Sequence, residues 1–147
     1  MGPVLIAYDG SDFAKAAIEQ AGRELKTDRK ALVVTVWQPL GSTPFFGGPT
    51  GIVPDQVLEG VQKTAAAVAA EGAELARSAG FDAEPITAEG DPIWSTIIDA
   101  ADEHDAAIVV LGSHGRTGFD YVALGSVATS VAQHSRRPVM VAKTAAA

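Results

Sequence analysis

Two short glycine segments carry the residue types from which a phosphate-binding site could be built. Gly112-Ser113-His114-Gly115 follows the apolar run 106–111, and nine residues separate Gly115 from the pair Gly125-Ser126. Glycine lets backbone N–H groups approach an anion without an intervening Cβ. A helix amino terminus adds free N–H donors and the positive end of a dipole. We therefore interpret the two segments as a cradle for nucleotide phosphates, in which Ser126 either caps a helix or donates its hydroxyl to phosphate.

Four other polar residues lie where they could contact such a ligand. Asp9 follows an apolar run, and we favour a ligand role for it, although it could simply start a turn or cap the next helix. His114 is a general base or, more often for a loop histidine, a solvated side chain. Arg116 can pair with phosphate or face solvent. Lys15 lies one turn into the first predicted helix, and we interpret it as part of the solvent-exposed face of that helix rather than as a phosphate contact.

The hydrophobic pattern predicts the elements that must position these residues. Apolar runs predict strands over 4–8, 31–37, 83–88, 106–111 and 138–142, and amphipathic segments predict helices over 12–26, 55–79, from 91 onward, and 126–134. Ser11 or Asp12 caps the first helix, and Gly80 closes the second. Alternating strands and helices predict a parallel sheet with helices on both faces. Ligands of such sheets bind at the carboxyl ends of strands, where Asp9 and Gly112 fall.

Composition limits the class of protein. The 147 residues suit one domain, 1–147, interrupted by a long Pro/Gly-rich loop at 38–54 that is either functional or a bland connection. A net charge of -7 argues against a nucleic-acid partner. The chain has no cysteine, no visible secretory signal and no apolar run long enough for a membrane helix. We therefore expect a cytoplasmic protein with no membrane partner.

At the glycine segments the chain resembles the universal stress protein family. Its ATP-binding branch carries the pattern Gly, two residues, Gly, nine residues, then Gly-Ser or Gly-Thr, which Gly112, Gly115, Gly125 and Ser126 match without a gap. The segments 4–11 and 138–141 also look like the family, so the resemblance covers the whole chain. The pair Arg136-Arg137 departs from the family pattern, and so does Asp120-Tyr121 within the nine-residue spacer.

The resemblance implies an α/β fold, a three-layer sandwich with a five-stranded parallel sheet of the Rossmann-like, adenine nucleotide alpha hydrolase-like type. It implies ATP, or an ADP- or AMP-type nucleotide, as ligand. Carried over by position, Asp9 would lie near the ribose and phosphates, and Ala7 and Val36 would line the adenine pocket. Ribose and phosphates would be held by Gly112, Gly115, Gly125, Ser126 and Val127. His114 and Arg116, chosen above for their own chemistry, complete the predicted nucleotide-binding set.

Catalytic machinery is not evident in the sequence. There is no nucleophile with a base and an orienting group, and no Gly-Lys-Ser or Gly-Lys-Thr of a Walker A loop. We expect a nucleotide-binding stress-response sensor or regulator with no catalytic residue. The alternatives are a slow ATPase, in which Asp9, His114 and a metal position water, and a dimeric interaction module with a structural nucleotide.

The remaining candidates have structural interpretations. Trp37 and Trp94 are better explained by packing than by base stacking. Asp99, Asp102, Glu103 and Asp105 form an acidic cluster that we expect to be a solvated face, so no protein metal site is predicted. Mg or Mn would instead be carried by the nucleotide phosphates. The apolar segment 138–142 predicts a sheet edge that pairs two copies into a homodimer, as the resemblance also implies.

Overall fold

The computed structural model describes residues 1–39, 55–114 and 124–143. Within these ranges the chain forms one five-stranded sheet in the order β3-β2-β1-β4-β5, and every neighbouring pair is parallel. The elements, in chain order, are β1 (Val4–Ala7), α1 (Asp12–Glu24), β2 (Lys30–Trp37), α2 (Asp55–Ser78), β3 (Asp82–Glu89), α3 (Ile93–Glu103), β4 (Ile108–Gly112), α4 (Ser126–His134) and β5 (Val139–Ala142).

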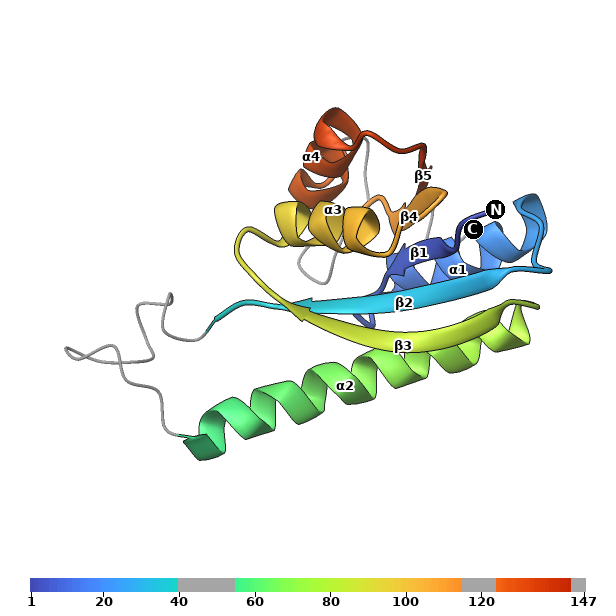
Figure 1. Cartoon of the computed structure of the whole chain (residues 1–147). Coiled ribbons are helices and arrows are strands. Elements are labelled where there is room, and N and C mark those ends of the chain that lie inside the picture. The colour runs from blue at the N-terminus through green and yellow to red at the C-terminus, as the bar shows by residue number, and fades with distance from the viewer. Residues whose placement is uncertain (40–54, 115–123, 144–147) are drawn as a thin grey trace.

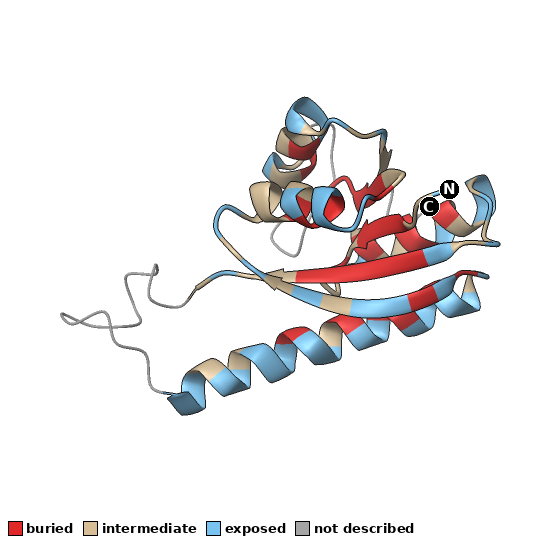
Figure 2. Cartoon of the chain, viewed as in Figure 1, coloured by how far each residue is buried: buried red, intermediate tan, exposed pale blue. Residues whose placement is uncertain are grey.

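Helices cover both faces of this sheet, because side chains of successive strand residues point to opposite sides. On β1, Val4 and Ile6 join the apolar cluster built with α1 and α2, whereas Leu5 joins the one built with α3 and α4. Figure 1 shows α3 and α4 on one side of the strands and α2 on the other. Figure 2 shows the buried residues concentrated in β1, β2 and β4. The predicted α/β three-layer sandwich with a five-stranded parallel sheet is confirmed.

Most predicted elements lie within two residues of their observed ends. Ser11 is the residue that caps α1, since its Oγ accepts a hydrogen bond from the Ala14 N–H at 3.1 Å. β4 begins at Ile108, two residues after its predicted start, and includes Gly112. The N–H groups of Ala106 and Ala107 instead donate to Ala101 and Pro3, and so lead the chain from α3 into the strand.

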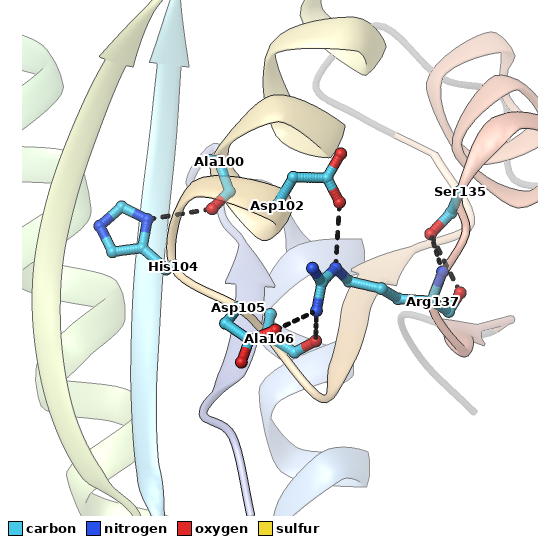
Figure 3. A network of polar contacts seen from close by, with 7 residues as sticks. All are labelled: Ala100, Asp102, His104, Asp105, Ala106, Ser135 and Arg137. Carbon is cyan, nitrogen blue, oxygen red and sulfur yellow. Dashed lines mark hydrogen bonds and ion pairs between the residues drawn. The ribbon is translucent and has the colours of Figure 1, made fainter.

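A network around Arg137 ties three segments together at the end of the sheet where β4 begins (Figure 3). Its guanidinium donates to Asp102 at 3.0 Å, to Asp105 at 3.2 Å and to the backbone oxygen of Ala106. Ser135 Oγ holds the turn before β5 through the backbone of Arg137. Hydrogen bonds to these two carboxylates raise the pKa of Arg137 further.

Half of the predicted acidic cluster is thus paired rather than simply solvated. Asp102 and Asp105 face Arg137, a residue that the sequence pattern marked as unusual without assigning it a partner. Across residues 1–39, 55–114 and 124–143, no group of three or more His, Cys, Asp or Glu side chains could hold a metal ion. A search of the same residues finds no helix with the length and apolar character needed to cross a membrane.

Two glycines of α2 have opposite environments and therefore test how the helix packs on the sheet. A Cβ at Gly72 would lie 2.6 Å from Tyr8 Cδ2 and 2.7 Å from Val33 Cγ1, whereas a Cβ at Gly60 would meet nothing within 4 Å. We predict that Gly72→Ala lowers the free energy of unfolding by about 1–3 kcal/mol through overpacking. Gly60→Ala, the matched control, should raise it by about 0.5–1 kcal/mol through helix propensity. Urea unfolding followed by circular dichroism checks both.

Equal effects of the two substitutions would contradict this account of α2 packing. A destabilising Gly60→Ala would show that the helix is already constrained at that position.

Candidate functional site

A large cavity lies at the carboxyl ends of β1, β2 and β4, with a volume of about 1030 Å³. Ligand pockets of proteins commonly span about 300–1,000 Å³, so the cavity is large enough for a nucleotide. Eight of the ten predicted site residues line it: Ala7, Asp9, Val36, Gly112, His114, Gly125, Ser126 and Val127. The other two, Gly115 and Arg116, lie outside the described residues. Residues from β1, β2, β4 and α4, or from the ends of these elements, thus meet around one space.

Asp9 lies in the turn between β1 and α1. Its Oδ1 accepts a hydrogen bond from the Ser11 N–H at 3.0 Å, while Ser11 in turn caps α1. The turn also contains Gly10, whose φ of +83 is a conformation that glycine adopts readily. The turn interpretation and the ligand interpretation of Asp9 are therefore compatible, because one carboxylate oxygen orders the turn and the side chain still borders the cavity.

The two glycine segments are in direct contact with each other. The Gly125 N–H donates to the Ser113 backbone oxygen at 2.7 Å. A Cβ at Gly125 would lie 3.0 Å from that same oxygen and 3.3 Å from His114 Cα. A side chain at position 125 would therefore push the start of α4 away from the end of β4, which explains why glycine suits this position.

Gly112 has a different reason to be glycine from the one its motif suggests. A Cβ there would lie 2.7 Å from both the carbonyl carbon and oxygen of Phe13, on α1. Gly112 is also the last residue of β4, where it pairs with Ala142, and not part of a turn. Its lack of a side chain lets α1 pack against the strand.

The amino end of α4 opens toward the cavity with free backbone donors. Gly125 is the N-cap residue and makes no side-chain capping hydrogen bond. Of the two roles expected for Ser126, capping is therefore wrong, because Ser126 is the first helical residue, and its side chain is exposed. Ser126, Val127 and Ala128 all line the cavity. The first N–H groups of a helix have no intrahelical partner, so this end can accept an anion.

Apolar side chains form most of the remaining wall on the α3 and α4 side of the sheet. Val34 and Val36 of β2 share that face because they are two residues apart, and Ile93 and Ile97 of α3 lie opposite them. This arrangement offers a dry surface for a flat apolar group beside the polar end of the cavity.

Sequence reasoning missed the contribution of α2 to the cavity. Its first half lines the opposite wall through Val57, Gly60, Val61, Thr64, Ala65 and Val68. The period of these residues marks one face of the helix, but nothing in the pattern distinguishes a face that lines a cavity from one that packs in a core. Trp37 also borders the cavity, whereas Trp94 stacks on His134 with ring centroids 4.5 Å apart.

Tyr8 joins the cavity to the core beneath it. Its ring is 2% exposed, and its hydroxyl donates to Glu71 of α2, which also lies 3.9 Å from Lys15 Nζ. Burial first, and then the hydrogen bond and negative charge of Glu71, raise the pKa of the Tyr8 phenol well above its usual range. Lys15 is therefore engaged at the outer surface of α1 and α2, in keeping with its predicted wet face.

Sequence comparison places the chain among proteins of one family. Residues 1–143 match the model of the universal stress protein family. Universal stress protein YxiE of Bacillus subtilis is 31% identical over 146 residues, which cover 95% of this chain and 97% of that protein.

Two solved structures share the fold. Protein MJ0577, whose sequence is from Methanocaldococcus jannaschii, superposes with a TM-score of 0.76 at 22% identity, over 96% of this chain and 94% of its own. A universal stress protein crystallised in complex with cAMP superposes with a TM-score of 0.68 at 26% identity, over 97% of each chain.

Proposed function

Because this chain belongs to the universal stress protein family, we propose that it binds an adenine nucleotide, ATP foremost, and serves as a nucleotide-responsive stress regulator. The observation that carries the proposal is the meeting of Asp9, the paired glycine segments and the open end of α4 around one cavity. The related protein crystallised with cAMP supports the choice of an adenine nucleotide.

The shape of the cavity supports one orientation of the ligand. Phosphates would lie at the start of α4, where the N–H groups and the positive end of the helix dipole favour negative charge. The base would lie against the apolar wall of Ala7, Val34 and Val36. Asp9, between these two ends, would accept hydrogen bonds from ribose hydroxyls. Any Mg or Mn would arrive with the phosphates.

Regulation rather than rapid hydrolysis is supported by the charge of the cavity wall. Among the described residues that line it, none is lysine or arginine. Phosphoryl transfer depends on cationic groups that stabilise charge on the moving phosphoryl group. Asp9 and His114 remain the residues on which a slow ATPase would depend, since both border the cavity.

A homodimer is the second part of the proposal, because the two edges of the sheet differ in chemistry. β3 carries three acidic residues and Pro85, features that protect an edge, whereas β5 is apolar throughout. The backbone oxygens of Pro138 and Ala142 accept hydrogen bonds from Val109 of β4 and from Ser113, which follows β4. Since backbone groups alternate in direction along a strand, those of Val139 and Val141 face the open edge, where a second copy can pair.

The nucleotide proposal predicts saturable binding that depends on Gly125. Calorimetric titration with ATP, AMP and cAMP should show binding of at least one nucleotide by the intact chain. Gly125→Val should abolish it, because the branched side chain separates α4 from Ser113 and enters the phosphate path. Ser126→Ala keeps the amide, and should weaken binding by about 3–10-fold through loss of one hydrogen bond.

Thermal unfolding of each variant provides the control for folding. Unchanged affinity in a folded Gly125→Val variant would contradict the phosphate site. If the intact chain shows no binding of any of the three nucleotides at millimolar concentration, the proposal is wrong.

Hydrolysis should be slow. We expect single-turnover phosphate release from ATP on the order of 10⁻⁴ s⁻¹ or less, the level of an NTPase that lacks its arginine finger. Release of inorganic phosphate under excess protein measures it. Rapid multiple turnover that is lost in Asp9→Asn or His114→Gln would instead establish an ATPase.

The dimer should depend on the outward N–H of Val141. Val141→Pro removes that donor without removing a bond to β4, and proline is tolerated on edge strands, so a monomer is expected. Val141→Ala is the matched control, since it shortens the side chain and keeps the N–H, and it should remain dimeric. Light scattering of the three proteins gives their masses. A monomeric parent chain, or a dimeric Val141→Pro variant, would exclude this interface.

A further inference from the structure

Ser113 is held at the junction of β4, β5 and α4 by its backbone and its side chain. It is 2% exposed. Its N–H donates to Ala142 at 2.8 Å, and its backbone oxygen accepts from Gly125. Its Oγ lies 3.1 Å from His114 Nδ1 and 3.5 Å from the Lys143 backbone oxygen. The hydroxyl is therefore placed between an imidazole nitrogen and a carbonyl group.

This contact orients the imidazole of His114 in the cavity wall. The ring packs on Phe13, with centroids 5.0 Å apart and a tilt of 50°. Its Cδ2 lies 3.4 Å from the Cβ position of Gly125. Because Nδ1 and the Cδ2–Nε2 edge are on opposite sides of an imidazole, Nδ1 faces Ser113 while the Nε2 edge lies on the side of the ring nearest Gly125. Nε2 is thus next to the helix end where phosphate is proposed to bind.

The Ser113 hydroxyl can serve both protonation states of this ring. Toward a neutral imidazole it can donate to Nδ1. Toward a doubly protonated ring it can accept from the Nδ1 N–H and donate to the Lys143 carbonyl, which leaves the Nε2 N–H for a third acceptor. A phosphate oxygen at the start of α4 would supply that acceptor and pair with the positive charge.

The charge of the described surroundings favours such a cation. The chain carries a net charge of -7, and the described cavity wall contains Asp9 and no lysine or arginine. A charged partner would add to what the helix amides supply for an anionic phosphate that leaves water for this wall. His114 is the one side chain of the described wall that can become positive by gaining a proton.

We propose that nucleotide binding is coupled to uptake of one proton by His114, with Ser113 as the residue that positions the ring to carry it. This rests on the proposed nucleotide site and adds a mode of regulation, since affinity then falls as pH rises. The proton enters at Nδ1, the nitrogen that carries no hydrogen in the neutral tautomer to which Ser113 donates, and no bond of the nucleotide changes.

Other titratable groups near this ring are few in the part of the chain that the structure describes. The elements packed against β4, which precedes His114, carry Tyr8 and Asp9 after β1, Asp12 and Lys15 on α1, and Lys143 after β5. α4 carries none before His134 at its far end. Burial and Glu71 keep the Tyr8 proton in place, because both raise its pKa.

Proton uptake is measured by calorimetry at pH 8 in buffers of different ionisation enthalpy. The probe is whichever of ATP, AMP and cAMP binds tightest. The intact chain should take up a measurable fraction of one proton per nucleotide, and His114→Gln should take up none. Between pH 6 and 9 the affinity of the intact chain should fall by up to about tenfold per pH unit, whereas that of His114→Gln stays level. The controls His104→Gln and His134→Gln should behave like the parent chain.

Ser113→Ala separates positioning from mere packing. It removes one oxygen from a buried site, and should reduce both proton uptake and the pH dependence without abolishing binding. Nitrogen-15 chemical shifts of the His114 ring should show both nitrogens protonated in the complex of the parent chain.

The outcomes distinguish this inference from the proposed function. Binding with no proton uptake, or with equal uptake in His114→Gln, overturns the coupling and leaves the nucleotide site standing. Absence of binding by all three nucleotides overturns both.

Discussion

The parallel pairing of β1 with β4 is the contact on which the site depends. Val4, Leu5 and Ile6 lie beside Ile108, Val109 and Val110, although about a hundred residues separate them in the chain. Because the strands are parallel, their carboxyl ends meet at one edge of the sheet, and Asp9 arrives next to the glycine segment after β4. The chain first builds β2 and β3 on one side of β1 and then β4 and β5 on the other. This reversal of direction leaves a crevice between the flanking helices.

Small residues then decide how closely the helices approach that crevice. Gly112 lets α1 contact β4, and Gly72 lets α2 contact Tyr8 and Val33. Gly125 lets α4 begin against Ser113. At all three positions neighbouring protein atoms occupy the space that a Cβ would take. The glycines therefore shape the cavity by letting the helices pack closely on the strands around it. The backbone amides of α4 that face the cavity are a consequence of that packing.

Sequence patterns predicted the layers of the fold because each buried strand and each amphipathic helix carries its own periodicity. They also predicted the carboxyl-edge site, since Asp9 and Gly112 follow apolar runs. They failed where a property depends on distant contacts. The pairing of Arg137 with Asp102 and Asp105 joins residues more than thirty positions apart. The wall formed by α2 depends on where that helix lies over the strand ends, which its own period does not encode.

The capping error at α4 has the same origin and bears on the chemistry. A serine at the start of a predicted helix is typical of an N-cap. Here the contact between Gly125 and Ser113 makes Gly125 the N-cap, one residue before the position expected if Ser126 were the cap. The Ser126 hydroxyl therefore does not cap the free N–H groups. Those donors stay open toward the cavity. The same contact holds the His114 backbone against Gly125, so one hydrogen bond places both the amides and the imidazole at the same end of the cavity.

Charge is divided unequally between the two ends of the sheet, and this division constrains how a phosphate can be held. At the end where β4 begins, Arg137 pairs with two carboxylates and donates to a carbonyl group (Figure 3). It is not among the residues that line the cavity. At the carboxyl end, Lys15 is paired with Glu71 on the outer surface. Within the described residues the cavity wall therefore offers dipoles and one imidazole rather than permanent cations. In the proposed nucleotide site, the affinity for an anion would depend on whether that imidazole is protonated, whereas a lysine or arginine site would be insensitive to pH near neutrality.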